Sequence, residues 1–108
     1  MMRADIIIKS GHVTDPARGV DREETVAVKN RRIIPYEEGM EADTFIDAAG
    51  CIVTPGLIDY HAHLFELGTD SGVDPDTAML PQGVTFAVDV GCAGVSTYRS
   101  LLERFAAC

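Results

Sequence analysis

The sequence predicts an α/β fold whose N-terminal part is rich in β-strands. Residues 1–54 contain short runs of β-branched and aromatic residues between turn-forming residues, which is typical of a small all-β unit. The pattern changes at Pro55-Gly56, after which residues 55–108 follow the order strand, long loop, strand, helix. Because a parallel α/β barrel begins in that order, we expect a β unit at 1–54 and the start of a barrel at 55–108. The barrel would be incomplete, since 108 residues fall far short of the roughly 250 of a full one.

The first part should contain four or five short strands. Three consecutive isoleucines within residues 5–9 predict a buried strand, and Ser10-Gly11 is then expected to turn the chain. The polar segment 12–22 contains a proline and a glycine, so it predicts a loop. The remaining strands are expected at 24–29, 33–34, 44–46 and 51–54.

The turn at Asn30-Arg31 is expected to be a loose one. Asparagine tolerates the positive φ angle of a two-residue hairpin turn, but the position after it favours glycine. Arg31 fits that position poorly, so we expect a connection longer than two residues. Pro35 cannot donate to a sheet, which limits the strand before it to an edge or an end.

The second part opens with a strand at 57–63. On a strand with period-2 alternation, Asp59, His61 and His63 share one face. The residues between them, Ile58, Tyr60 and Ala62, share an apolar face that helices are expected to cover.

The remaining elements follow a long connection at 64–82, which has room for one or two helical turns at 76–80. The apolar run 84–88 predicts a strand buried on both faces of a parallel sheet. Apolar residues at helical spacing predict a helix over 96–107, with Ser96 as its N-cap.

Composition excludes several classes of partner. The formal net charge is -8 and no basic cluster is longer than Arg31-Arg32, so we expect no nucleic-acid partner. No stretch approaches the roughly 18 apolar residues of a membrane span, and the N-terminus lacks the apolar run of a signal peptide. Cys51, Cys92 and Cys108 are too widely spaced for a disulfide framework or a zinc knuckle, so a reducing cytoplasm is the expected location.

The pair His61 and His63 is the strongest candidate for a binding site. Two residues apart on a strand, the imidazoles leave one face with Cβ atoms roughly 6–7 Å apart. Because a zinc–nitrogen bond is about 2.0–2.1 Å, both rings can lean onto one ion. Taken without its context, the pair is more often two ordinary strand histidines than a metal site.

The context is the segment from Pro55 to His63, which resembles the PGxxDxHxH signature of the amidohydrolase superfamily. In that family the segment leads from a small β-sandwich into strand 1 of a TIM-type barrel, and its histidines bind the more buried metal. Residues 72–76 and 83–89 are similar to the dihydroorotase-like and deacetylase-like branches. The resemblance therefore implies that His61 and His63 bind a divalent metal, with zinc as the first choice.

Two aspartates close to the pair have two interpretations each, and one further histidine and one cysteine are assigned a structural role. Asp59 either orients a ligand histidine or is a buried carboxylate satisfied by backbone donors. Asp89 is expected to cap the loop before the helix, although it could instead orient a ligand. We expect His12 to be a surface residue, and Cys92, on the presumed active face, to be a small buried thiol.

The ligand set of the family is incomplete in this sequence. The resemblance calls for a barrel lysine, two further histidines and an aspartate on later strands. The only lysines are Lys9 and Lys29, and the third histidine is His12, all within 1–54. We therefore expect any metal to be weakly held or absent, and this chain alone to hydrolyse little or nothing.

The resemblance implies the N-terminal portion of a metal-dependent amidohydrolase that cleaves C–N bonds of cyclic amides or N-acyl compounds. Its substrate would be a small-molecule amide or imide. The alternative is a non-catalytic, degenerate subunit or assembly module, and a plain β-rich domain with an accidental histidine pair is a third hypothesis. Open strand edges predict self-association in either of the first two cases.

Overall fold

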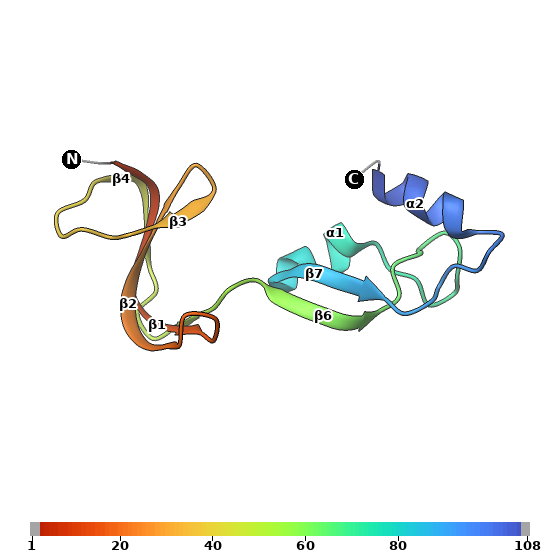
Figure 1. The fold of residues 1–108 in the computed structure, drawn as a ribbon, viewed down its shortest axis with the longest axis horizontal. Helices are drawn as coiled ribbons and strands as arrows, with labels where there is room; N and C mark the ends of the chain where they lie inside the picture. The colour runs from red at the N-terminus through yellow and green to blue at the C-terminus, as the bar shows by residue number, and fades with distance from the viewer. Residues whose placement is uncertain (1–2, 107–108) are drawn as a thin grey trace. The chain divides into compact units, whose positions relative to one another are not determined.

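The computed structural model describes residues 3–106, which divide into two compact units at the junction between Pro55 and Gly56 (Figure 1). Cys108, considered above, lies outside the described residues. The fold is rich in strands and has few helices. Within the described chain, no helix combines the length and the apolar character that crossing a membrane requires. The elements are β1 (Ala4–Asp15), β2 (Val20–Lys29), β3 (Arg32–Ile34), β4 (Ala42–Asp47), β5 (Ile52–Val53), β6 (Leu57–Ala62), α1 (Pro75–Ala78), the 3-10 helix η1 (Leu80–Gln82), β7 (Val84–Asp89) and α2 (Tyr98–Ala106).

The first unit is built around β1. Its five strands form one mixed sheet in the order β3-β2-β1-β4, with β5 also paired to β1. β2 runs antiparallel to β1, whereas β4 and β5 run parallel to it along successive parts of its length. The expected sandwich of two facing sheets is therefore not formed by residues 3–55, which make a single sheet.

The loop predicted at 12–22 is wrong. β1 continues to Asp15 and pairs with β2 from Gly11 opposite Glu24 to Asp15 opposite Val20. The polar composition of this segment suggests a loop because only alternate residues of the two strands face the core. Val13 and Val20 are buried, while His12 is exposed and bonds to Asp21 across the strands at 2.8 Å.

Ser10-Gly11 does not turn the chain either. Ser10 has a φ of 63°, and the register of β1 with β2 shifts between Ile8 and Gly11, which marks a β-bulge inside a continuing strand. A Cβ atom at Gly11 would lie 2.5 Å from a methyl group of Val53, so glycine is needed where β5 meets β1.

The loose turn expected at Asn30-Arg31 is also wrong. Lys29 pairs with Arg32, which leaves a connection of only two residues. Asn30 and Arg31 both adopt positive φ angles, 49° and 63°, as a two-residue hairpin turn requires. The Asn30 amide donates a 2.7 Å hydrogen bond to Oδ2 of Asp5, which helps to hold the strained turn against β1.

Two apolar clusters stabilise this sheet. Ile7 packs with Ala27, and both are fully buried, whereas the next residue, Ile8, packs with the cluster of Val13 and Val26. Neighbouring residues of β1 enter different clusters because successive side chains of a strand alternate between faces. The run of three isoleucines is thus explained by apolar packing on both sides of the strand.

The second unit contains one parallel strand pair, β6 and β7, and its three short helical elements (Figure 1). The strands predicted at 57–63 and 84–88 and the short helix near 76–80 are all confirmed within a residue or two. The helix α2 begins at Tyr98, so the predicted N-cap Ser96 is wrong. Thr97 makes the preceding turn, and its Oγ1 accepts a 3.0 Å hydrogen bond from the Gly94 amide.

Only part of the strand pair is covered. Ala62, Leu64 and Met79 are buried together, and Phe105 of α2 packs against them. The remaining large side chains of the two strands are exposed, contrary to the prediction of a covered apolar face and of a strand buried on both sides; they are Leu57, Ile58, Tyr60 and Phe86. The helical segments cover only the part of the strand pair around Ala62, so the exposed side chains have no packing partner among the described residues.

Candidate functional site

The candidate site lies at the carboxyl ends of β6 and β7. Because the strands are parallel, these ends lie at the same edge, where Ala62 pairs with Asp89. The Val90 amide continues the pairing with a 3.2 Å hydrogen bond to the Ala62 carbonyl. His63 directly follows β6, and Cys92 follows β7 by three positions. In parallel α/β folds this end of the strands carries the functional groups.

His61 and His63 lie beside each other. Their ring centroids are 5.7 Å apart and their planes meet at 74°, an edge-to-face arrangement, and both side chains are exposed. The register of β6 with β7 shifts between Asp59 and Ala62, so the simple alternation assumed from the sequence is interrupted there. The rings nevertheless stay adjacent, as the spacing of the two residues predicted.

Asp59 contacts the backbone of the first histidine. Its Oδ1 accepts a 3.0 Å hydrogen bond from the His61 amide, two residues along the chain. This contact closes the irregular segment of β6 on itself and so fixes the backbone that carries the His61 ring. The orientation of an imidazole by this carboxylate remains a prediction.

Asp89 organises the edge on which the site lies. Its Oδ1 accepts hydrogen bonds from the amides of Gly91 and Cys92, at 2.9 and 2.8 Å, and its Oδ2 accepts one from Leu64 at 2.8 Å. Burial raises the pKa of this carboxyl, but the backbone donors outweigh burial and lower the pKa to about 2. The predicted cap of the loop is confirmed. The bond to Leu64 was not foreseen.

Cys92 is in contact with the second histidine. Its Sγ lies 3.0 Å from Nδ1 of His63, and the side chain is half-buried. The sequence predicts only a small buried thiol at Cys92 and does not predict this contact. The available signal was its place just beyond the strand that neighbours the histidine pair.

The donors at this edge fit a metal in their chemistry. Two imidazoles and a thiol are ligands that zinc prefers. As they stand, no three His, Cys, Asp or Glu side chains within residues 3–106 are arranged to hold an ion together. Metal binding would therefore require Cys92 and His63 to exchange their mutual contact for contacts to the ion.

The remaining predicted residues lie in the first unit. His12 is exposed beside Asp21, as a surface histidine should be. Lys9 lies on β1 and Lys29 ends β2. None of the three belongs to the unit that carries His61 and His63.

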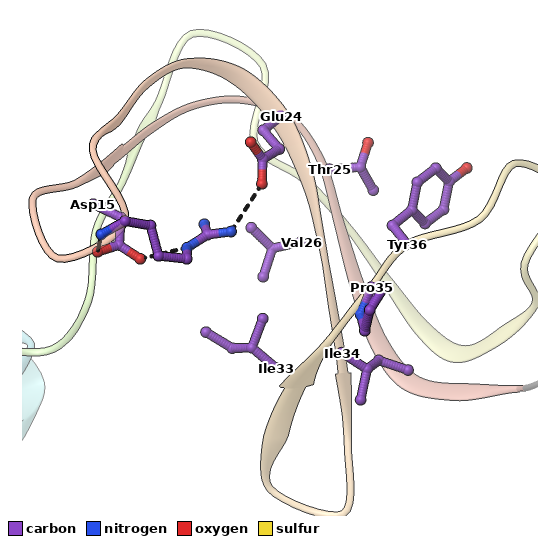
Figure 2. A pocket seen from close by; sticks show the side chains of 9 residues that line it. Asp15, Glu24, Thr25, Val26, Ile33, Ile34, Pro35 and Tyr36 are labelled. Atoms are coloured by element: carbon purple, nitrogen blue, oxygen red, sulfur yellow. Dashed lines mark hydrogen bonds and ion pairs between the residues drawn. The ribbon is translucent and has the colours of Figure 1, made fainter.

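The first unit also contains a pocket of about 470 Å³ (Figure 2). Its wall holds Arg18, whose Nε donates to Asp15 at 2.7 Å and whose Nη1 donates to Glu24 at 3.1 Å. The Arg18 hydrogen bond is the main cause that lowers the pKa of Asp15. These charges satisfy one another across the β1–β2 hairpin, and the pocket also has an apolar wall formed by Val26, Ile33 and Ile34.

Comparisons with known proteins agree on one family. A model of the "Amidohydrolase family" matches residues 44–102, which include β6, β7 and the histidine pair. The dihydroorotase of Geobacter sulfurreducens is 42% identical over 69 residues, which cover 61% of this chain and 16% of that protein. The dihydroorotase of Geotalea daltonii is 36% identical over 91 residues, which cover 82% of this chain and 21% of that protein.

A solved structure is also similar. The N-acyl-D-glutamate deacylase from Bordetella bronchiseptica, crystallised with zinc and a phosphonate inhibitor, superposes with a TM-score of 0.66 at 29% identity. The match covers 84% of this chain and 19% of that one. The chain thus spans about a fifth of the length of the relatives it matches.

Proposed function

Because the chain belongs to the amidohydrolase family, we propose that it contributes His61 and His63 as metal ligands to a hydrolase of C–N bonds in cyclic amides or N-acyl compounds. The observation that carries this proposal is the adjacency of the two imidazoles, 5.7 Å between centroids, at the carboxyl ends of parallel strands. The names of its relatives, dihydroorotase and N-acyl-D-glutamate deacylase, support the choice of substrate class.

Three residues would hold the metal: His61, His63 and Cys92. The thiol is included because it already contacts the His63 ring at 3.0 Å. Zinc is the preferred ion, since it accepts imidazole nitrogen and thiolate sulfur in one tetrahedral site. When bound, such an ion polarises a carbonyl oxygen and lowers the pKa of a bound water.

The surrounding carboxylates hold the chain in place around these ligands. Asp89 binds the Cys92 amide and the Leu64 amide, so it fixes the backbone beside both Cys92 and His63. Asp59 does the same for His61 through its amide. Held backbones reduce the conformational freedom that a metal would otherwise have to remove on binding.

We propose that hydrolysis by this chain alone is weak or absent. The sequence has three histidines, and the third, His12, is bonded to Asp21 in the other unit. Its only lysines, Lys9 and Lys29, also lie in that unit. An ion held by two imidazoles and a thiol would keep an open position. However, the unit that carries them, from Gly56 onward, contains no further histidine or lysine to complete a second metal position.

A titration of the metal-free 108-residue protein with Co²⁺ tests the site. We expect one ion per chain and a near-ultraviolet sulfur-to-cobalt absorption band, which Cys92→Ser should remove. His61→Ala and His63→Ala should each lower the affinity at least about tenfold, because loss of a ligand costs no less than loss of a residue that orients one. His12→Ala is the matched control and should bind as the unaltered protein does. Equal binding by all variants would refute the assignment.

A second candidate function, a non-catalytic assembly module, is supported by the surface of β6 and β7. Ile58, Tyr60 and Phe86 are 65%, 77% and 60% exposed. In the described chain β7 pairs only with β6, so the other edge of each strand is open. Strand edges and apolar faces of this kind drive association, and we propose a second copy of this chain as the partner.

Sedimentation equilibrium of the chain tests this association. We expect a concentration-dependent dimer that Phe86→Thr weakens about tenfold, because an aromatic side chain contributes about 1.5–3 kcal/mol when buried. Ile33→Thr is a matched control, since Ile33 is 65% exposed but lies on the other unit. A monomer at all concentrations, or an equal effect of both substitutions, would count against the proposal.

A further inference from the structure

The peptide group that joins His63 to Leu64 is held at both ends. Its carbonyl oxygen, on His63, accepts a 2.8 Å hydrogen bond from the amide of Val73. Its amide, on Leu64, donates a 2.8 Å hydrogen bond to Oδ2 of Asp89. Because a peptide group is planar, these two bonds fix the backbone directly after His63, and with it the direction in which the imidazole leaves the chain.

Val73 is placed by the residue that follows it. Oδ1 of Asp74 accepts hydrogen bonds from the amides of Asp76 and Thr77, at 2.9 and 3.1 Å, and so caps α1. Oδ2 of Asp74 accepts a hydrogen bond from the Arg104 guanidinium on α2. The Asp74 side chain is only 17% exposed, so solvent screens this ion pair less than a pair on an open surface.

The loop of residues 64–74 is closed on itself, so Asp74 at its end is held close to the residues at its start. A Cβ atom at Gly72 would lie 2.1 Å from the carbonyl oxygen of Phe65, so the two ends of the loop touch where only glycine fits. Arg104 also faces Glu66 at 3.8 Å, so one guanidinium faces a carboxylate near each end of the loop.

We propose that Arg104 and Asp74 form a clamp that positions His63 through the amide of Val73. The clamp acts on the backbone of His63 and touches no substrate or metal, so both are positioning residues. Its effect on metal binding rests on the proposed function, whereas its effect on the loop does not.

Two substitutions release the clamp without removing the helix cap. Arg104→Gln deletes the guanidinium charge, and Asp74→Asn keeps an oxygen that can cap α1. Each should speed hydrogen exchange at the Val73 amide about tenfold and lower the Co²⁺ affinity about tenfold, as expected for a residue that supports a ligand from outside the metal shell. Arg104→Lys should restore part of both losses. Arg99→Gln, on an exposed position of the same helix, is the control and should change neither.

The two readouts separate this inference from the proposed function. If the unaltered chain binds no Co²⁺, the metal proposal fails, and exchange at Val73 still decides whether the clamp exists. If Arg104→Gln leaves Val73 exchange unchanged, the clamp is overturned. Equal acceleration at Val73 and at the β7 amides would also overturn it, because the pair would then be a general stabiliser of the unit.

Discussion

Replacement of Asp89 with alanine is expected to destabilise the second unit by about 3 kcal/mol. The carboxylate accepts three backbone hydrogen bonds, from Leu64, Gly91 and Cys92. Alanine has no acceptor in its side chain, so all three amides would lose this hydrogen bond. An unsatisfied, partly buried donor costs about 1–3 kcal/mol, and water reaches some of these groups, so the total is less than a simple sum. Urea unfolding followed by backbone amide NMR, which resolves each unit, provides the measurement.

Asp70→Ala is the control for this substitution, because Asp70 is an exposed carboxylate of the same unit. It should change the free energy of unfolding by less than about 0.5 kcal/mol. If the two variants are equally stable, Asp89 does not organise the edge as described.

The effect of Asp89 should depend on pH in a defined direction. Its pKa is about 2 in the folded chain against an ordinary value of 3.8, so the carboxylate favours the folded state while it is ionised. Its contribution is fully present above the unfolded pKa and is lost as the pH falls through the folded pKa. The stability difference between the unaltered protein and Asp89→Ala should therefore be constant above about pH 5 and shrink toward pH 2. A difference that grows on acidification would contradict the assignment.

Ile7→Ala is expected to destabilise the first unit by about 4 kcal/mol. Ile7 is 0% exposed and packs with Ala4, Ala27 and Met40 at the centre of the sheet. Truncation of a fully buried isoleucine typically costs about 2–5 kcal/mol, because the lost apolar burial is joined by the cost of a cavity. The strand itself should persist, since alanine keeps its backbone bonds. The free energy of unfolding, read from amides of β1 and β2, gives the result.

Ile33→Ala provides the comparison for Ile7→Ala. Ile33 belongs to the same sheet but is 65% exposed, so its truncation should cost less than about 1 kcal/mol. Similar losses from the two substitutions would show that the cluster around Ile7 is not the principal core of the unit.

Two wrong predictions in the first unit, a loop at 12–22 and a loose turn at 30–31, have one physical origin. The segment 12–22 has a polar composition, yet most of it is strand because pairing with the neighbouring chain satisfies its backbone. Arg31 disfavours a tight turn by local preference, but the pairing of Lys29 with Arg32 imposes one. In both places, cross-strand hydrogen bonds overrode a local preference of about 1–2 kcal/mol per residue.

The sequence by itself determined the family, the two strands that carry the histidine pair and the adjacency of His61 and His63. These features depend on local order along the chain, where a period of two residues and a short motif are sufficient. Tertiary structure alone decided the contact of Cys92 with His63, 29 residues away, and the bond from Leu64 to Asp89, 25 residues away. Both contacts depend on the register between β6 and β7, which shifts twice along the pair. A shift of one residue changes which side chains meet, and the periodicity of a single strand does not reveal such a shift.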